Sequence, residues 1–402
     1  MTPFSPLALA TSPPPVMEAR RWIAGATFPP DRPLLNLSQA APVDPPPAPL
    51  CAAMAEMLTD PTCHLYGPVL GQPELRAEIA ERWSLAYGGR IAPADVAITA
   101  GCNMAFCAAM ATIAAPGDAV MLPTPWYFNH KMWLDLMGIE TVPLPCLADM
   151  TPDPDAARAR MTPRVKAIVL VTPNNPTGAE YPGGLLADFA GIARAAGAAL
   201  VVDETYRDFD GRTGAPHDLF ADPDWRDCLV HLYSFSKAFR LTGHRTGAII
   251  ADPTRLAEAE KFLDTVAICA PQLGQRAATW GLRNLGDWVA GERAEILRRR
   301  AAAKAILSGL PGWEVRGCGA YFAYVRHPFA APSDQVAQAL VREASILVLP
   351  GTMFGPTLAQ GGDGGPEREL RVAFANSGVE GLAEMGRRLA AVGGEIGASS
   401  PA

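Results

Sequence analysis

The chain has 402 residues, a length that favours two connected domains with a sizeable core over a small disulfide-stapled module. Nearly half of the residues are apolar (49%) and 19% are charged, which is the profile of a packed globular protein and argues against wholesale disorder. The formal net charge of -7 offers no general attraction to the phosphate backbone of nucleic acid or to anionic lipid, so neither is expected as a partner.

The cysteines and the amino terminus indicate a cellular compartment. Eight cysteines are scattered without a repeated pair spacing, so neither a disulfide framework nor a metal site is expected. The amino terminus lacks a basic stretch, and its apolar run Leu7–Ala10 soon meets the prolines at 13–15. Because no apolar segment approaches the roughly 20 residues of a membrane span, we expect a soluble cytoplasmic protein.

The predicted elements begin with an arm, residues 1–48, which holds most of the thirteen prolines found in the first 50 residues. We expect it to be extended and draped over the body of the molecule. It is also expected to pack on a small second domain and on a partner subunit. From 49 to 285, short apolar runs alternate with stretches of helical period, which predicts a large α/β domain with a mostly parallel sheet between helices. The expected strands are Val96–Thr99, Ala119–Leu122, Ala167–Val171, Ala199–Val202, Leu229–Tyr233 and Gly247–Ala251.

The last part of the chain has its own strand signals. An arginine-rich helix near residues 285–305 precedes two expected strands, Gly319–Val325 and Ile346–Leu349. We therefore predict a second, smaller α/β domain over residues 286–402.

Polar side chains follow the predicted strands of the large domain. Gly101, Cys102 and Asn103 lie between a strand and a helix, where backbone N–H groups favour an anion such as phosphate, although a plain tight turn explains this string about as well. Asn175 follows the expected strand 167–171. Asp203 directly follows the expected strand 199–202, and a carboxylate at the end of a buried strand needs a hydrogen-bond or charge partner. In parallel sheets such strand ends form ligand sites.

Lysine usage identifies one amine. Only five of the 34 basic side chains are lysines, and Lys237 alone lies at a strand end among small hydroxyl residues, with Arg245 shortly after it. Arginine cannot replace lysine where a primary amine must form a Schiff base. The strand ends together supply an amine, a carboxylate, an amide, a phenol and a phosphate cradle, which is the set that pyridoxal 5'-phosphate requires.

These strings resemble the class I/II aminotransferases of the fold type I pyridoxal-phosphate enzymes, over about residues 35–374. The similar strings are Asn175-Pro-Thr-Gly178, Asp203-Glu-x-Tyr206, Ser234-x-Ser-Lys237 and Gly-x-Arg245-x-Gly. The resemblance implies that Lys237 is the Schiff-base lysine and that Asp203 is the partner of the pyridinium nitrogen. It implies that Asn175 and Tyr206 hydrogen-bond the ring oxygen, and that Ser234, Arg245 and the backbone of Cys102 and Asn103 hold the phosphate.

Further positions match the family outside these strings. Tyr66 resembles the tyrosine that reaches the phosphate of the neighbouring subunit, which implies a homodimer with shared active sites. Tyr127, preferred over Trp126, matches the ring that stacks on the cofactor, and His130 falls where some members place a histidine behind the carboxylate. Arg371 matches the arginine that binds the substrate α-carboxylate.

Two departures from the family pattern concern the substrate. Ala40 stands where relatives usually carry glycine, so the space above the cofactor could be narrowed. The segment 261–271 holds Asp264 but no arginine where dicarboxylate-specific relatives place a second one. A clear preference for aspartate is therefore not supported. The mixed apolar and aromatic lining expected from Ala40, Tyr127 and the Tyr321–Phe322 region mildly favours neutral or aromatic amino donors.

The hypothesis for function is an aminotransferase that moves an amino group between an L-amino acid and a 2-oxo acid. A carbon–sulfur β-lyase of the same fold shares the early chemical steps and stays open as an alternative. A non-catalytic cofactor-sensing module is a remote third, because no basic winged-helix segment precedes residue 50.

Overall fold

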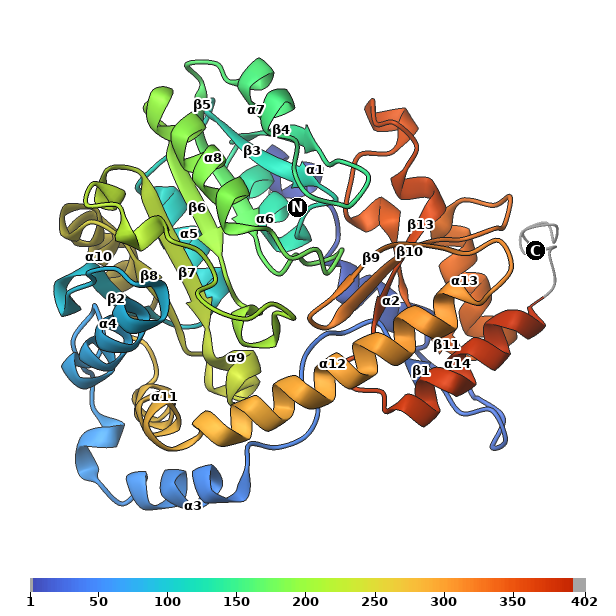
Figure 1. Cartoon of the computed structure of the whole chain (residues 1–402), viewed down its shortest axis with the longest axis horizontal. Coiled ribbons are helices and arrows are strands. Elements are labelled where there is room, and N and C mark those ends of the chain that lie inside the picture. Colours follow the sequence, from blue (N-terminus) through green and yellow to red (C-terminus); the bar gives the residue numbers. More distant parts are fainter. Residues whose placement is uncertain (1–2, 393–402) are drawn as a thin grey trace.

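A computed structural model describes residues 3–392, which form a large and a small α/β region (Figure 1). The large region is built on a seven-stranded sheet in the order β2-β8-β7-β6-β5-β3-β4. Only β8 runs antiparallel to its neighbours, so the sheet is mostly parallel, as predicted. Its strands are β2 (Val96–Thr99), β3 (Ala119–Thr124), β4 (Glu140–Pro145), β5 (Val165–Val171), β6 (Ala199–Asp203), β7 (Leu229–Ser234) and β8 (Gly247–Ile250).

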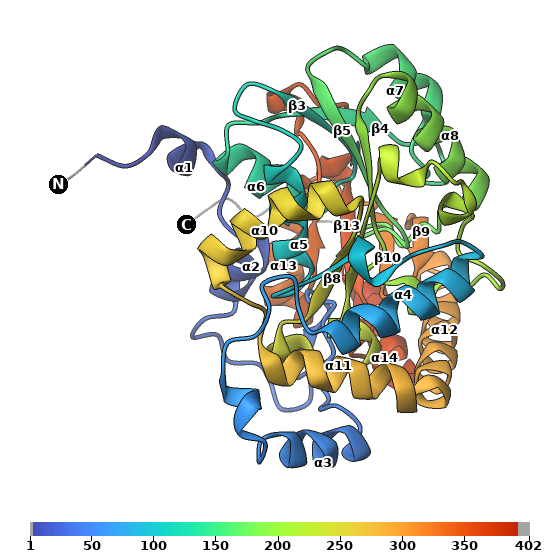
Figure 2. The ribbon, with the colours of Figure 1, turned by 90° about the vertical axis from the view of Figure 1, so that its left-hand side faces the viewer.

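Helices cover both faces of this sheet, which is therefore buried on each side (Figure 2). On one face the core includes side chains of α4 (Pro73–Tyr87), α8 (Gly183–Ala195) and α11 (Gln272–Asn284). On the other face it includes side chains of α5 (Cys102–Ala111), α6 (Phe128–Leu136) and α10 (Pro253–Ala267). Along β6, Leu200 and Val202 belong to the first core and Ala199 and Val201 to the second, as the alternation of a strand requires.

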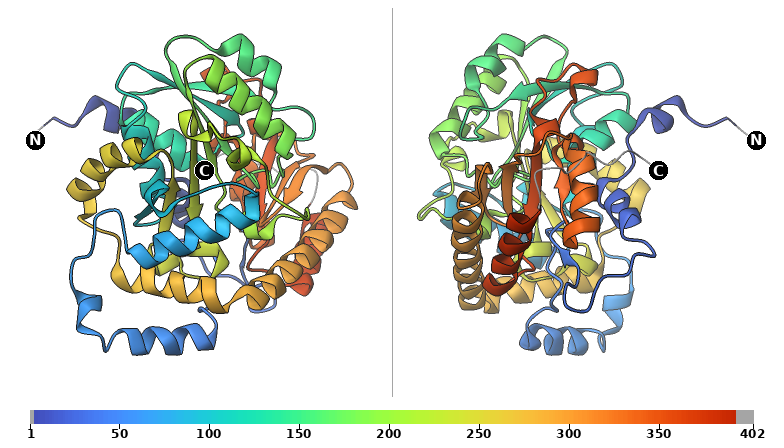
Figure 3. Two further views of the ribbon diagram at one scale, coloured as in Figure 1. Left: turned by 60° about the vertical axis from the view of Figure 1, so that its left-hand side comes forward. Right: turned by 90° about the vertical axis from the view of Figure 1, so that its right-hand side faces the viewer.

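The small region contains a four-stranded antiparallel sheet in the order β12-β13-β10-β9. These strands are β9 (Glu314–Gly319), β10 (Phe322–Arg326), β12 (Leu349–Pro350) and β13 (Glu369–Ala373). Its core includes side chains of α12 (Gly286–Ser308), α13 (Ser333–Ala344) and α14 (Val379–Ala391). The long α12 runs from the large region to the small one, where it lies beside α14 (Figures 1 and 3).

The amino-terminal arm is not wholly extended, and that part of the prediction is wrong. It contains α1 (Pro6–Ala10) and α2 (Pro15–Trp22), and both helices begin at a proline. Proline fits the first turn of a helix, where its missing N–H has no partner in any case. Beyond α2 the arm does run along the body, where β1 (Leu35–Asn36) pairs in parallel with β11 (Ile346–Leu347) of the small region.

Three other elements differ from the prediction. The expected strand Gly319–Val325 is a hairpin, because β9 ends at Gly319 and Ala320 turns the chain with a φ of 43°. The expected strand 346–349 divides into β11 and β12. The prediction missed β4, whose two prolines weaken the strand signal and are tolerated at the sheet edge.

The remaining helices are short or lie at the periphery: α3 (Ala48–Met57), α7 (Pro154–Arg160) and α9 (Phe235–Ala238). Within residues 3–392, none of the helices combines the length and the apolar character needed to cross a lipid bilayer.

Candidate active site

A cavity of about 150 Å³ lies at the carboxyl ends of β5, β6 and β7, next to the start of α5. This is where ligands bind in open α/β sheets. Most of the predicted site residues meet here, although they are up to 143 positions apart in the chain. The lining consists of Cys102, Asn103, Tyr127, Val171, Asn175, Asp203, Thr205, Tyr206, Ser234, Ser236, Lys237 and Arg245.

Lys237 is positioned by the short helix α9, which begins directly after β7. The Ser234 side chain caps this helix by accepting a hydrogen bond of 3.2 Å from the N–H of Ser236. The Lys237 ammonium lies 5.7 Å from the centre of the Tyr206 ring. Burial, together with the positive charge of Arg245, lowers the pKa of Lys237 to about 8. An appreciable fraction of this amine is therefore neutral near physiological pH.

Asp203 is the last residue of β6, and its carboxylate is almost completely buried. It accepts a hydrogen bond of 3.0 Å from the N–H of Thr205, and its Oδ2 lies 3.4 Å from His130 Nε2. Burial alone would raise the pKa of Asp203, but His130 and Thr205 together hold it below its ordinary value. The His130 ring stacks in turn on the Phe106 ring, with 3.9 Å between the ring centres, and this contact fixes its orientation. The predicted histidine behind the carboxylate is therefore present.

The start of α5 and Arg245 form the basic end of the cavity. Gly101 precedes the helix with a φ of 87°, a conformation that favours glycine. A Cβ at this position would overlap the Arg245 guanidinium, so the guanidinium lies directly over the glycine. The free N–H groups at the start of α5 and the arginine thus face one space, which is the electrostatic environment an anion needs.

The two amides after β5 have different tasks. Asn174 is structural, because its Oδ1 accepts hydrogen bonds from the N–H and the hydroxyl of Thr177 and so closes the turn. Asn175 lines the cavity, and its Oδ1 accepts a hydrogen bond of 2.9 Å from Arg371. Because Oδ1 is occupied, the NH₂ group of Asn175 is the part that can donate to a ligand.

Arg371 lies in β13 of the small region and is only 2% exposed. Besides Asn175, it donates to the backbone oxygen of Ser38 in the amino-terminal arm. Its guanidinium lies 5.1 Å and 5.0 Å from the ring centres of Phe322 and Phe354. Burial lowers the pKa of Arg371 to about 10, so it remains positively charged at neutral pH.

The structure distinguishes between the two aromatic candidates. Tyr127 lines the cavity, whereas Trp126 lines a separate cavity beside the amino-terminal arm. The Tyr127 hydroxyl accepts a hydrogen bond of 2.9 Å from Asn129 and donates to Asn103 at 3.4 Å. Burial raises the pKa of Tyr127 to about 12, so the phenol stays protonated at neutral pH.

Four predicted site residues are not among those that line the cavity. Gly101 and Arg371 adjoin it, since Gly101 directly precedes Cys102 and Arg371 bonds to Asn175. Tyr66 is 78% exposed and lies in another cavity, of about 650 Å³, together with Leu65 and Trp280. Ala40 is buried in an apolar cluster of the small region that also includes Tyr206.

Sequence reasoning missed Thr205 and Ser38. The string that contains Asp203 and Tyr206 treats position 205 as variable, and no side-chain pattern reports that its backbone N–H binds the carboxylate. Ser38 contributes through its carbonyl oxygen, which every residue possesses, so no sequence signal could have identified it.

The residues of this cavity fit pyridoxal phosphate. The group needs an amine for its aldehyde, an anion beside its ring nitrogen, donors for its ring oxygen and a basic cradle for its phosphate. Lys237, Asp203, Tyr206 and the start of α5 with Arg245 provide these functions around one cavity. A Cβ at Gly247 would overlap the backbone of Gly101 and Cys102, so the cradle is closely supported from behind by β8.

Comparisons with known proteins agree with this geometry. Residues 32–389 match the family model of aminotransferase class I and II. An aromatic aminotransferase of Arabidopsis thaliana is 30% identical over 94% of this chain and 96% of its own length. An arginine–pyruvate transaminase of Pseudomonas aeruginosa is 28% identical over 90% of this chain and 91% of its own.

Solved structures extend the agreement to the fold. A mutant of Thermus thermophilus aspartate aminotransferase superposes with a TM-score of 0.85 at 25% identity, covering 97% of this chain and 99% of that one. The predicted fold type I architecture is therefore confirmed. The chain belongs to the aminotransferase class I and II family and is a pyridoxal-phosphate-dependent aminotransferase.

Proposed function

We propose that this aminotransferase takes neutral or aromatic L-amino acids as donors, passes their amino group to a 2-oxo acid, and works as a homodimer with shared active sites. The observation that carries the proposal is the setting of Arg371. This buried arginine is bonded to Asn175 beside the Lys237 cavity and is flanked by two phenylalanine rings.

The residues around the cavity hold the cofactor. When bound, pyridoxal phosphate supplies an aldehyde that condenses with amines and a ring that accepts the electrons of the bond being broken. Asp203, kept ionised by His130 and Thr205, holds a proton on the ring nitrogen. Tyr206 and the Asn175 amide donate to the ring oxygen, Tyr127 packs against the ring, and the phosphate is held by Ser234, Arg245 and the backbone of residues 101–103.

Lys237 and Arg371 act on the substrate. The planar Arg371 guanidinium binds the α-carboxylate through two parallel hydrogen bonds and so fixes the direction of the Cα–H bond. The Lys237 amine, released from the cofactor aldehyde when the donor binds, would take the α-proton and deliver it to the carbon that keeps the amino group. Its lowered pKa, about 8, suits both directions of this proton movement at neutral pH.

The side chain of the donor meets an aromatic environment. Phe322 and Phe354 lie beside Arg371, and the Tyr206 ring contacts Tyr321 and Phe322 at centroid distances of 5.4 Å and 5.1 Å. Among the described residues that line the cavity, Arg245 is the one arginine, and the phosphate occupies it in this proposal. Among the described residues of one subunit, a second carboxylate on the substrate would therefore find no further cation in the cavity lining. The name of the Arabidopsis relative, an aromatic aminotransferase, supports the same preference.

The position of Tyr66 supports the proposed homodimer. This residue is 78% exposed, and Met57, Leu65 and Trp280 line the same partly apolar cavity. In the proposed dimer, this surface joins two subunits, and each subunit's Tyr66 reaches the phosphate site of the other. The arm, residues 1–48, also contacts the partner, while 49–285 form the cofactor domain and 286–402 the small domain, of which residues 393–402 lie outside the part that the structure describes.

A donor panel with 2-oxoglutarate and pyruvate as acceptors tests the substrate class. We expect kcat/KM for phenylalanine, tyrosine, methionine or leucine to exceed that for aspartate at least about tenfold, because a carboxylate in an apolar pocket loses its hydration. Aspartate or arginine as the best donor would refute the preference. Release of pyruvate and ammonia from cystathionine without an oxo acid, faster than any amino transfer, would favour the β-lyase.

The oligomeric state is tested separately by analytical ultracentrifugation. Sedimentation of the holoenzyme as a monomer would refute the dimer.

A further inference from the structure

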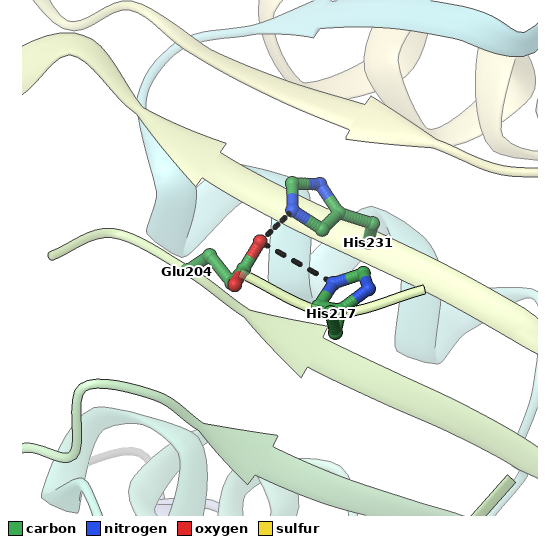
Figure 4. Close-up of side chains that lie close together, drawn as sticks. All are labelled: Glu204, His217 and His231. Carbon is green, nitrogen blue, oxygen red and sulfur yellow. Dashed lines mark hydrogen bonds and ion pairs between the residues drawn. The ribbon is translucent and has the colours of Figure 1, made fainter. Parts of the chain in front are cut away.

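A second cluster of titratable side chains lies directly behind the active site. Asp203 and Glu204 are consecutive at the end of β6, so their side chains leave the sheet on opposite faces. Asp203 faces the layer of α5 and α6, where it meets His130. Glu204 faces the layer of α4, where it meets His217 and His231 (Figure 4). All three side chains of this cluster are buried.

The contacts of Glu204 with Tyr87 and the two histidines all involve one carboxylate oxygen, Oε2. Its Oε2 accepts hydrogen bonds from the Tyr87 hydroxyl and, at 2.7 Å, from His231 Nε2, and it lies 3.5 Å from His217 Nε2. Burial would raise the pKa of Glu204, but the two histidines hold it well below its usual range. The Arg207 side chain donates to the Tyr87 hydroxyl at 3.4 Å and supplies a positive charge nearby. Glu204 is therefore an ionised, fully buried carboxylate.

The tautomer of His217 decides between a metal site and a hydrogen-bonded carboxylate. The three side chains have potential ligand atoms within 4.8 Å of one another, which is close enough to hold a metal ion. However, the backbone N–H of Leu219 donates to His217 Nδ1 at 3.2 Å. A backbone N–H can only donate, so Nδ1 carries no proton and a neutral ring carries its proton on Nε2. That N–H faces Glu204 Oε2 at 3.5 Å, too far for a hydrogen bond in this structure, and it leaves no Nε2 lone pair for a metal.

The cluster joins four segments at the back of the site. Glu204 follows β6, His231 lies in the neighbouring β7, Tyr87 ends α4, and His217 belongs to the segment that returns from β6 to β7. The backbone N–H of Glu204 also bonds to Leu232 of β7 at 2.9 Å. The turn fixed in this way carries the cavity residues Asp203 and Tyr206, and β7 leads into Ser234 and Lys237.

We propose that Glu204 is a positioning residue of the aminotransferase reaction: held by Tyr87, His217 and His231, it fixes the ends of β6 and β7 and thereby sets Asp203 and Tyr206 relative to Lys237. The inference rests on the roles proposed above for those three residues. It assigns a functional task to a carboxylate that does not itself touch the cofactor or the substrate.

The holoenzyme variant Glu204→Gln tests this inference. The amide keeps the shape but turns donors toward the histidines, so the turn that carries Asp203 shifts. We expect kcat to fall about tenfold with little change in KM, and the midpoint of the pH-dependent visible absorption of the bound cofactor to move. The matched control is Asp95→Asn, which removes another buried carboxylate, bonded to Arg226 beside the edge strand β2 of the same sheet. It is expected to lower the melting temperature and leave kcat and the absorption midpoint unchanged.

Further variants keep the outcome decisive. If Glu204→Gln has the kcat and absorption midpoint of the wild type and only melts earlier, as the control does, the inference is overturned. If it does not fold, Tyr87→Phe decides, since it removes one hydrogen bond without changing charge: a shifted midpoint supports the inference and an unshifted one refutes it. Stoichiometric zinc in the purified protein that is lost in His217→Ala would also overturn it. Full activity of Asp203→Asn would instead refute the proposed function.

Discussion

The two sheets of the molecule position their functional side chains in different ways. In the large sheet, Asp203 and Lys237 lie where strands end, and local turns and a short helix hold them. In the small sheet, Arg371 lies inside β13, opposite Tyr324 of β10, and its guanidinium is held by residues of other segments, Asn175 and Ser38. The first arrangement builds a reaction centre from neighbouring loops. In the second arrangement, the orientation of Arg371, and therefore binding of the substrate carboxylate, depends on contacts between the small region, the large region and the arm.

The largest effect is expected at the reaction centre. Lys237→Ala removes the amine that forms the covalent link and moves the proton, so kcat should fall by at least roughly 10³-fold. Turnover of phenylalanine with 2-oxoglutarate measures it, and borohydride reduction of the holoenzyme should no longer attach cofactor to this peptide. Lys261→Ala is the control, because Lys261 is exposed and paired with Glu258 at 2.7 Å. Equal turnover in both variants would refute the role of Lys237.

The next effect tests the contribution of the small sheet. Arg371→Lys keeps the charge but loses the planar fork, so kcat/KM should fall about 100-fold, mainly through higher KM values for both amino and oxo acids. Arg388→Lys is the matched control: Arg388 is also buried in the small region, but it bonds to Glu384 and to the carbonyl of Pro33. That variant should lose stability and keep its KM. A drop in kcat alone for Arg371→Lys would place this arginine in the chemical step.

The same contrast explains how far the sequence could predict the structure. The strands at 96–99, 199–203 and 229–234 were predicted to within one residue, because each is a short apolar run that ends at polar residues. The site residues at their ends could be named for the same reason. The β9–β10 hairpin was not predicted, since the residue with positive φ is Ala320, whereas the nearby Gly317 and Gly319 belong to β9.

Contacts between distant segments were beyond the sequence as well. Glu204 was visible in the Asp203 string, but nothing in the string reports that His217 and His231 converge on it. The Arg371 interaction with Ser38 joins residues 333 positions apart through a backbone oxygen. Such contacts depend on the packing of whole segments, which local periodicity does not encode.

A smaller effect is expected at the basic end of the cavity. The Lys237 amine must be neutral to capture an aldehyde, so the rate at which apoenzyme binds pyridoxal phosphate should rise with pH through about 8 and then level off. Arg245→Gln removes a positive charge that favours the neutral amine, so this midpoint should move to higher pH, and cofactor affinity should fall about tenfold. Absorbance after mixing measures both. Arg158→Gln, which removes an exposed arginine of α7 paired with Asp155, is the control. A midpoint that moves to lower pH would contradict the assignment.

The smallest effect concerns Ala40, where the sequence and the structure lead to different expectations. The sequence suggested that its methyl group narrows the space above the cofactor, but the methyl is buried in the small region's core and does not line the cavity. Ala40→Gly should therefore change the ratio of kcat/KM values for phenylalanine and alanine less than about threefold, while the free energy of unfolding falls by about 1 kcal/mol because one buried methyl group is lost. Ala375→Gly, in the same core and also outside the helices and strands, should match that loss of stability. A tenfold gain for bulky donors in Ala40→Gly alone would show that the arm, as well as the two sheets, shapes the substrate site.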